Sequence, residues 1–454
     1  MSPWSNGARR LSTSIAAAGL ATTLVLTGCS GPGGGGGAGG ATDSGSQSDI
    51  DAALDKETQL TFWAWGPQYQ AVVDAFNKAH PKVKVTLQNQ GSGTDQYTKL
   101  QNVIKAGSGI PDISQIEFSV SPQFALGGSL LDLNSFGLQS MKDKFSESSW
   151  GASQFNGALY GLPQDAGPMA MFYRKDVFDT YGLTVPKTWD EYIAAARKLK
   201  KADSSKFIAA DAGDAGATNG LIWQAGGRPY KTEGDQVTVS FDDEGTKKYA
   251  KTYSPLIEER LVDTKTAGFT PEWNSGLANG KYATLVTGAW AAGTLQRRIP
   301  DATGKWRVAP MPKFAAGDEV TGQTGGSLSA VMKASPNKAA AIGFVQWMAS
   351  SPEASKIWTE LGGFPCTTAT LTSQEWLNIE VPYFGNQKIN QVFAQSAEQV
   401  GQGWQFLPFQ AYANSVYADT VGQAYVGETS LLSGLQAWEK SITNYGNSQG
   451  FKVS

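Results

Sequence analysis

Alternating strand-like and helix-like segments between residues 59 and 116 restrict the possible folds of this chain more than any other feature. Apolar and aromatic residues fill 59–65, and apolar residues at helical spacing follow over 69–79. A period-2 pattern at 82–87, a second helical segment at 97–105 and an apolar run at 111–116 continue the series. This β-α-β-α-β order is typical of a parallel sheet covered by helices and predicts an α/β fold. Ligands bind such sheets at the carboxyl ends of the strands.

The rest of the chain repeats the pattern less regularly. Residues 160–173 are expected to form two extended stretches with a bend at Gly167-Pro168. The further predicted elements are a helix over 189–200 with Thr188 as its N-cap, strands over 282–287 and 306–311, and helices over 339–349 and 431–445.

The scarcity of His and Cys excludes many kinds of catalytic site. The 454 residues include one His and two Cys, so a Ser-His-Asp triad, a Cys-His dyad or a zinc site would depend on His80. His80 lies between a predicted helix and a strand and is interpreted as a solvated helix end. The run Asp242–Glu244 lacks the ligand spacing of a calcium loop and is interpreted as a solvated turn. The net charge of −3 gives no indication of a nucleic-acid partner. Because nucleophiles and metal ligands are scarce, we also expect no metal, no cofactor and no catalysis.

The N-terminus has the pattern of an export signal. Arg9 and Arg10 precede a short apolar stretch at 15–26, and Leu26-Thr27-Gly28-Cys29 resembles a bacterial lipobox. We therefore expect residues 1–28 to be a lipoprotein signal peptide and Cys29 to be lipidated, which would anchor the protein at the cell surface, on the outer face of the cytoplasmic membrane. An ordinary cleavage site with a chance Cys is the alternative, and the export route, Sec or twin-arginine, stays open. Cys366 would then be the lone thiol of the folded part.

Residues 29–57 are rich in Gly and Ser, which predicts a flexible tether. The globular part of the chain is expected to begin near Thr58.

Motifs spread over residues 58–454 resemble those of the extracellular solute-binding proteins of ATP-driven (ABC) importers, in the carbohydrate-binding group related to maltodextrin-binding protein. The order and spacing of these motifs carry the resemblance, and no single one does. They are LTFWAWG at 60–66, AGSGIPDI at 106–113, LLDL at 130–133, the segment 158–192 that contains GLPQDAGP, YATLVTGAW at 282–290, VAPMP at 308–312, the segment 325–348 that begins GGSLSAV, and GGFPC at 362–366.

The resemblance implies two α/β lobes with a ligand cleft between them and a hinge of three segments, near residues 164–167, 308–312 and 349–352. Lobe 1 would comprise 58–165 plus 311–350, and lobe 2 would comprise 166–310 plus 351–454. The implied function is capture of an oligosaccharide by lobe closure and its delivery to the subunits of an ABC permease in the membrane, by a monomer.

The sequence also gives hints about origin and ligand. Residues 381–397 are similar to versions found in actinobacterial binders of xylo- or cello-oligosaccharides. The resemblance therefore points to an actinobacterial protein with a ligand of that type.

Sugars present apolar C–H faces and a rim of hydroxyls, so their sites need flat aromatic rings together with amides or carboxylates. Trp290 follows a predicted strand and matches the Trp of an NGPW-like family motif that stacks on sugar; a core-capping Trp is the alternative. Trp65 ends the first strand, while Trp63 is interpreted as core. Glu117 follows a strand and could accept two hydroxyls, or lie on the surface. Asp165, at the first hinge crossing, binds ligand or holds the hinge by hydrogen bonds.

Further candidate ligand-binding residues come from strand ends, the hinge and the family motifs. They are Gln68, Tyr69, Ser119, Gln164, Trp223, Gly326, Ser327, Phe364, Phe409 and Gln410.

Two other functions remain open from sequence. A surface-anchored glycoside hydrolase would use the same aromatic and acidic residues, since paired acids perform that chemistry. The chain lacks a clean series of about eight β-α units, which argues against a barrel enzyme. A binder of a non-sugar solute, such as an osmolyte or a peptide, is the third possibility.

Overall fold

The computed structural model describes residues 43–454, and the predicted signal peptide, Cys29 and residues 30–42 of the predicted tether lie outside the described residues. Its framework is a sheet of seven strands in the order β2-β1-β3-β11-β6-β10, with β9 also paired to β6. These strands are β1 (Thr58–Trp63), β2 (Val83–Gln88), β3 (Ile113–Glu117), β6 (Leu162–Arg174), β9 (Thr284–Gly288), β10 (Trp306–Ala309) and β11 (Gln323–Val331).

The predicted parallel unit is confirmed. Strand β1 pairs in parallel with both β2 and β3, and the connections run through α2 (Tyr69–Ala79) and α3 (Thr94–Ala106). Helix α2 buries Val72, Val73 and Phe76 against the sheet, as its apolar spacing predicts. His80 caps the end of this helix and stacks on Phe76.

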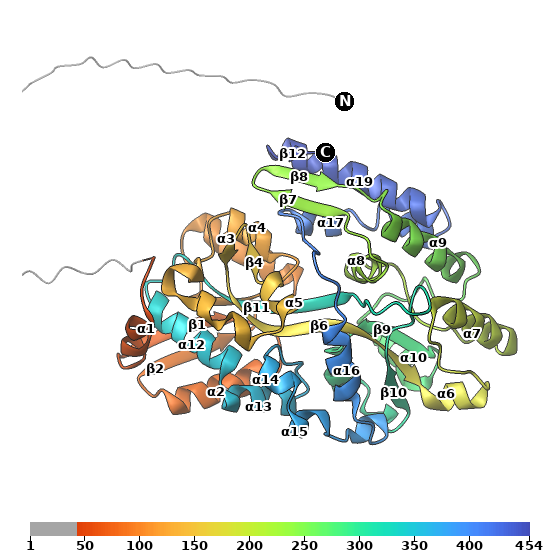
Figure 1. Cartoon of the computed structure of the whole chain (residues 1–454), viewed down its shortest axis with the longest axis horizontal. Helices are drawn as coiled ribbons and strands as arrows, with labels where there is room; N and C mark the ends of the chain where they lie inside the picture. Colours follow the sequence, from red (N-terminus) through yellow and green to blue (C-terminus); the bar gives the residue numbers. More distant parts are fainter. Residues whose placement is uncertain (1–42) are drawn as a thin grey trace, which may run out of the picture. The chain divides into compact units, whose positions relative to one another are not determined.

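Strand β6 joins the two parts of the sheet. It is one continuous strand of 13 residues, so the predicted division into two stretches is wrong. Up to Pro168 it pairs with β11, and from Met169 onward it pairs with β9 on one edge and β10 on the other. Figure 1 shows β6 in yellow, running from the group around β1 to the group around β9. The register between β6 and β11 is irregular at two points: β11 has an extra residue between Gln323 and Gly326, and β6 has an extra residue, Gln164, between Pro163 and Asp165.

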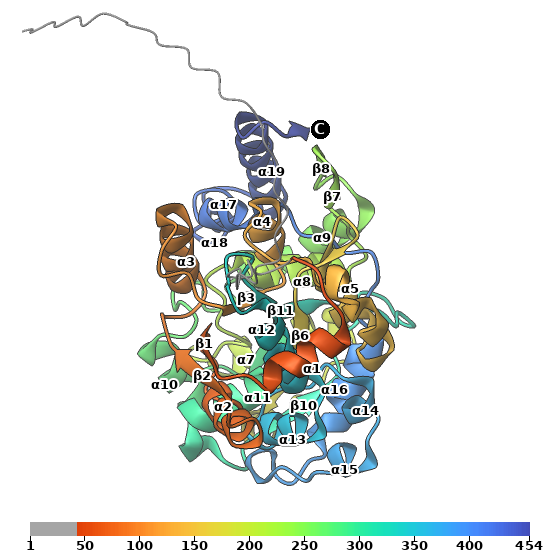
Figure 2. The same ribbon diagram turned by 90° about the vertical axis from the view of Figure 1, so that its left-hand side faces the viewer.

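A short helix, α1 (Gln47–Leu54), occupies part of the segment predicted as tether. Ser46 and Asp49 form a reciprocal capping box at its start, which satisfies two backbone N–H groups. Ile50 is fully buried, and α1 packs against α12 (Lys338–Ser350) (Figure 2). The prediction of flexible coil up to residue 57 is therefore wrong from Ser46 on, because the cap and one apolar side chain dock this segment on the folded part.

The other predicted elements are found within a few residues of their expected limits. Thr188 caps α7 by accepting a hydrogen bond from the backbone N–H of Glu191, as predicted. Asp243 caps α9, so the acidic run 242–244 is a helix start. The longer helices are α7 (Trp189–Ala202), α8 (Ala215–Gln224), α9 (Glu244–Glu258), α10 (Pro271–Asn279), α11 (Ala291–Arg298), α13 (Pro352–Glu360), α16 (Ile389–Glu398) and α19 (Leu431–Ser448).

Short elements complete the chain. They are α4 (Ser121–Leu126), α5 (Glu147–Ala152), α6 (Lys175–Thr180), α14 (Thr368–Leu371), α15 (Gln374–Leu377), α17 (Gln410–Ser415), α18 (Gly422–Tyr425), the hairpin of β4 (Gln154–Phe155) and β5 (Ala158–Leu159), a small sheet of β7 (Tyr230–Glu233), β8 (Gln236–Val239) and β12 (Lys452–Val453), and 3₁₀ turns at Leu133–Phe136, Leu138–Lys144, Pro300–Ala302 and Pro382–Phe384.

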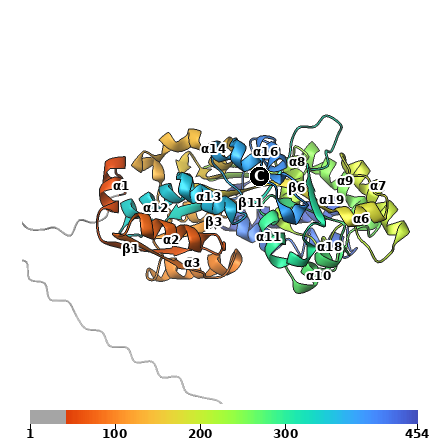
Figure 3. The ribbon, with the colours of Figure 1, turned by 90° about the horizontal axis from the view of Figure 1, so that it is seen from below.

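Buried side chains form three clusters that meet along the sheet. One contains the side chains between β1 and the helices α2, α12 and α13, which lie side by side in Figure 3. A second lies among α7, α8, α9 and α19, and a third beside β3 and α3. Between residues 43 and 454, no helix has the length and apolar composition needed to cross a membrane. Over the same residues, no three His, Cys, Asp or Glu side chains converge as metal ligands would.

The predicted lobe boundaries stay a prediction. Two residues of the segment 311–322, which the prediction assigns to lobe 1, form β-bridges with residues that it assigns to lobe 2. Lys313 bridges Thr188, and Thr321 bridges Val400.

Candidate ligand-binding cleft

A cavity of about 920 Å³ opens at the carboxyl ends of β1 and β3 and beside the central part of β6 and β11. Its volume is near the upper end of the range of about 300–1,000 Å³ that small-molecule sites occupy. All the predicted ligand-binding residues line this cleft except Gln164 and Phe409. The cleft therefore lies where the strand order of an α/β sheet predicts a ligand.

Trp290 lies in a seat built from glycines of three strands. A methyl group on Gly288 would come within 2.5 Å of the indole nitrogen, one on Gly325 within 3.0 Å, and one on Gly167 within 3.3 Å of the ring. The indole Nε1–H donates to the carbonyl oxygen of Thr324 at 2.8 Å. The ring is only partly buried, so these contacts fix its orientation while leaving it accessible to the cleft.

Glu117, Ser327 and Asp165 form a row across three neighbouring strands. Ser327 of β11 is paired with Glu117 of β3 on one side and with Asp165 of β6 on the other. Because directly paired residues point to the same face of a sheet, the three side chains face the cleft together. The side chain of Gln115 reinforces the row by donating to the Ser327 hydroxyl at 3.2 Å and accepting from the Trp65 backbone N–H at 3.1 Å.

The surroundings of this row disfavour the charged form of both carboxylates. Burial raises the pKa of Asp165 to about 7, and repulsion from Glu117 acts in the same direction, while hydrogen bonds from Ser327 oppose the rise. Burial also raises the pKa of Glu117, although the Tyr97 hydroxyl donates to its Oε2 at 3.0 Å. The Oδ1 atom of Asp165 is buried without a hydrogen-bond partner. This acceptor is unsatisfied, and in this conformation it is also out of reach of solvent.

The N-terminal side of the cleft contains Trp65 and Gln68. Trp65 is partly exposed and packs edge-on against Tyr97 with ring centroids 6.0 Å apart. Trp63 is buried, as predicted. Gln68 is nearly buried and donates weakly, at 3.4 Å, to the carbonyl of Leu361.

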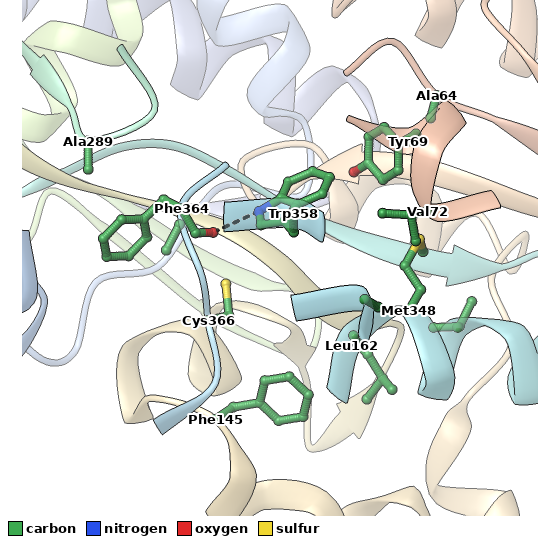
Figure 4. Packing of buried hydrophobic residues seen from close by; sticks show 14 of the residues in the cluster. Ala64, Tyr69, Val72, Phe145, Leu162, Ala289, Met348, Trp358, Phe364 and Cys366 are labelled. Carbon is green, nitrogen blue, oxygen red and sulfur yellow. Dashed lines mark hydrogen bonds between the residues drawn. The ribbon is translucent and has the colours of Figure 1, made fainter. Parts of the chain in front are cut away.

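Tyr69 and Phe364 lie at the base of this side and are buried. The Tyr69 ring is fully buried against Trp358, whose indole N–H donates to the carbonyl of Phe364 at 3.0 Å (Figure 4). Cys366, close by in the same view, is buried and unpaired. These rings support the cleft wall more than they face the space within it.

Trp223 belongs to a stacked pair that sequence alone did not indicate. Its ring lies parallel to that of Trp404, 6° apart with centroids separated by 5.0 Å, and its N–H donates to the carbonyl of Gly401. Arg228 donates twice to the carbonyl of Gln402 and so fixes the same loop. The Nε1 atom of Trp404 is buried without a partner.

The remaining predicted residues line the cleft in supporting positions. Ser119 follows β3 and is partly exposed, whereas Gln410 is fully buried and bonds within its own segment, to Leu407 and Asn414. Gly326 has a φ of +98°, and a Cβ there would meet the Phe118 ring at 2.7 Å. Only glycine fits this position, which brings the backbone of β11 to the cleft surface.

Two predicted residues do not line the cleft. Gln164 is buried beside Asp165 and is the extra residue of an irregularity in β6, unpaired with β11 between Asp165 and Pro163. Phe409 packs in the hydrophobic cluster with Tyr445 and Phe451. Phe409 is the N-cap residue of α17 and Gln410 is the first residue of that helix, and of the two only Gln410 lines the cleft.

The structure adds cleft residues that the sequence analysis missed. Among them are Asp214, Phe269, Trp404 and Arg298, from loops or helix ends, and Asn219 from the middle of α8. The segment VGQGWQF at 400–406, with an aromatic ring among glycines, was a signal that could have pointed to Trp404.

Taken together, the cleft presents aromatic ring faces on several walls and carboxylate and amide groups across its floor. Rings can cover apolar C–H faces, and carboxylates can accept hydroxyl hydrogen bonds. The arrangement suits a polyhydroxylated ligand that is held without covalent chemistry.

Comparison with known proteins agrees with this geometry. The ABC transporter associated binding protein from B. animalis subsp. lactis Bl-04, solved in complex with beta-1,6-galactobiose, is 39% identical with a TM-score of 0.81, and the match covers 87% of this chain and 99% of that one. The galacto-N-biose-/lacto-N-biose I-binding protein from Bifidobacterium longum, solved with lacto-N-biose, is 26% identical with a TM-score of 0.76, covering 87% and 98%.

Among curated sequences, the arabinooligosaccharide-binding protein of Bacillus subtilis (strain 168) is 26% identical over 343 residues, which is 73% of this chain and 78% of that protein. Residues 64–355 match the sequence pattern of the Bacterial extracellular solute-binding protein family. The predicted two-lobe α/β fold of this group is confirmed by these likenesses. The chain is therefore a member of the bacterial extracellular solute-binding protein family.

Proposed function

We propose that this protein is the solute-binding component of an ATP-driven sugar importer and that it captures an oligosaccharide in the cleft described above. The observation that carries the proposal is the combination of the Trp290 seat with the Glu117–Ser327–Asp165 row in one cavity of about 920 Å³. Flat rings and free acceptors are the two groups that a sugar needs.

The relatives support a sugar ligand. Their names specify galactobiose, lacto-N-biose and arabino-oligosaccharides, all of which are short chains of sugar rings. The 39% identical protein makes a β-linked galacto-oligosaccharide a candidate beside the xylo- and cello-oligosaccharides that residues 381–397 indicate. We infer that the ligand has at least two rings, because the cleft presents aromatic faces on more than one wall.

The family name places solute binding outside the cytoplasm. Cys29 would carry the lipid anchor there, and a permease in the membrane would receive the sugar from the closed protein. Replacement of Cys29 by Ala tests the anchor, because the variant should leave the membrane fraction and lose incorporation of a radiolabelled fatty acid. Retention of both would contradict it.

A thermal-shift screen followed by titration calorimetry tests the proposed function. The panel comprises β-1,6-galactobiose and xylo-, cello-, malto- and arabino-oligosaccharides of two to four rings. A ligand at about 100 times its dissociation constant stabilises the folded state by about 2.7 kcal/mol, which a melting curve resolves. A panel without any binder would contradict a sugar ligand.

Analysis of the same mixtures for shortened products separates binding from hydrolysis. Release of smaller sugars at a rate that depends on Glu117 and Asp165 would favour a glycoside hydrolase. Recovery of intact sugar after long incubation is the expected result.

A further inference from the structure

Phe269 combines three properties that are unusual in one residue. Its backbone φ is +65°, which is a genuine outlier for a bulky side chain. Its ring is 55% exposed, although an apolar ring of this size normally packs inside. It also lines the ligand cleft. Of the four non-glycine residues with positive φ in the described part of the chain, it is the only aromatic one.

Neighbouring groups hold Phe269 in this conformation. Arg298 donates from Nη1 to the Phe269 carbonyl at 3.2 Å, and its guanidinium lies 5.5 Å from the centre of the Phe269 ring. On the other side, Thr270 starts α10 by accepting from the backbone N–H of Trp273, so the chain cannot relax freely after Phe269. Backbone strain of this kind persists where the surrounding structure enforces it, and it concentrates at binding sites.

The ring of Phe269 extends the surface of Trp290. The two rings are stacked, 27° from parallel with centroids 6.1 Å apart, and both face the cleft. Trp273 supports Phe269 from behind at 5.3 Å. An exposed ring that continues an aromatic platform offers a place for a second apolar face of the ligand.

We propose that Phe269 is a ligand-binding residue that takes the C–H face of a sugar ring next to the one on Trp290, and that Arg298 is its positioning residue. The proposal rests on the proposed function and names the part of the ligand that this side of the cleft recognises. The proposal also gives the backbone strain at Phe269 a role. The φ of +65° directs the Phe269 ring into the cleft, and the folded state is less stable as a result.

Replacement of Phe269 by Gly tests this with two readouts of opposite sign. Glycine adopts positive φ without strain, so the urea midpoint of the unliganded variant should equal or exceed that of the wild type. Its affinity for β-1,6-galactobiose, or for whichever panel oligosaccharide binds the wild type best, should fall at least tenfold. Phe269→Tyr keeps the ring and should bind like the wild type.

Arg260→Gly is the matched control, because Arg260 has a φ of +54° outside the cleft. This variant should gain stability without any change in affinity. Arg298→Ala should weaken binding in the wild type but add no loss to Phe269→Gly, since it acts through that ring.

The possible failures are distinguishable. If wild-type protein binds no panel sugar, the proposed function fails and this inference falls with it. If the wild type binds and Phe269→Gly binds equally well, Phe269 has no ligand role and only this inference is overturned. A Phe269→Gly variant that loses stability would show that the ring is merely a structural support.

Discussion

Gly167 offers a severe test of how the centre of the cleft is built, because it lies on β6 where that strand passes β11. A Cβ on Gly167 would lie 2.8 Å from the carbonyl carbon of Thr324 and closer still to its oxygen. Nonbonded carbon and oxygen atoms rarely approach closer than about 3.3 Å, so Gly167→Ala must push β6 and the Thr324 carbonyl of β11 apart by more than an ångström. Backbone atoms on both sides cannot rotate away as a side chain would.

The cost can be worked out from the hydrogen bonds around this point. Separation of β6 from β11 weakens the bonds from Met169 N–H to Gly322 O (3.1 Å) and from Trp290 Nε1–H to Thr324 O (2.8 Å). Each is worth about 1 kcal/mol, so Gly167→Ala should lower the free energy of unfolding by about 2 kcal/mol. Overpacking in cores costs a similar amount.

Urea unfolding followed by circular dichroism measures this loss, and calorimetric titration measures sugar affinity on the same preparation. Affinity should fall about tenfold or more, because displacement of Thr324 also tilts the Trp290 ring that it holds. Gly151→Ala is the control, since Gly151 lies in α5 with no atom within 4 Å of its added Cβ, and should be as stable as the wild type or more so. If Gly167→Ala unfolds within about 0.5 kcal/mol of the wild type, the close packing of β6 on β11 described above is refuted.

Four further outcomes are expected. Trp290→Ala should weaken binding of the best panel sugar by about 2 kcal/mol in calorimetry, and an unchanged dissociation constant would remove Trp290 from the site. Because the pKa of Asp165 is raised from 3.8 to about 7 in the fold, its contribution to stability is fully present below about pH 4 and is lost as pH rises through 7; the free energy of unfolding should therefore fall between about pH 4 and pH 7 by more in the wild type than in Asp165→Asn, and equal slopes in urea titrations would contradict this. Ile50→Ala should cost about 2 kcal/mol or more in urea unfolding, whereas the exposed Asp51→Ala on the same helix should cost little, and equal midpoints would mean that α1 is not docked. In Cys29→Ala protein, the thiol of Cys366, whose burial raises its pKa, should react with a disulfide reagent only on unfolding; rapid reaction of the native protein would contradict its burial.

The regular elements of the fold could be predicted because their signals are local. Helix α2 follows from its own apolar spacing, and the start of α7 follows from Thr188, which caps it. The continuity of β6 could not be predicted, because Gly167-Pro168 usually signals a break, and only pairing with three partner strands overrides it. The docking of α1 was missed for a similar reason. One capping box is a weak signal beside a stretch that is rich in Gly and Ser.

The cleft was predictable in part. Residues at strand ends, such as Trp65, Glu117 and Trp290, lie there because sheet topology places those ends together. Phe269 and Asp214 come from loops whose paths depend on contacts far away in sequence, so nothing local marks them. The exclusion of Gln164 could not be predicted, because this residue lies at an irregularity in the pairing of β6 with β11 that no local signal marks.

The position of β11 has a consequence for the order in which the chain acquires its structure. This strand lies between β3 and β6, so the sheet contains a gap until residues 323–331 have been synthesised. The pairing of Glu117 with Ser327 joins residues more than two hundred positions apart, and such long-range closure slows folding because loop entropy must be overcome before the contact forms. We expect the chain to stay without its central sheet through most of translation, and we expect a fragment ending before β11 to remain open to proteases.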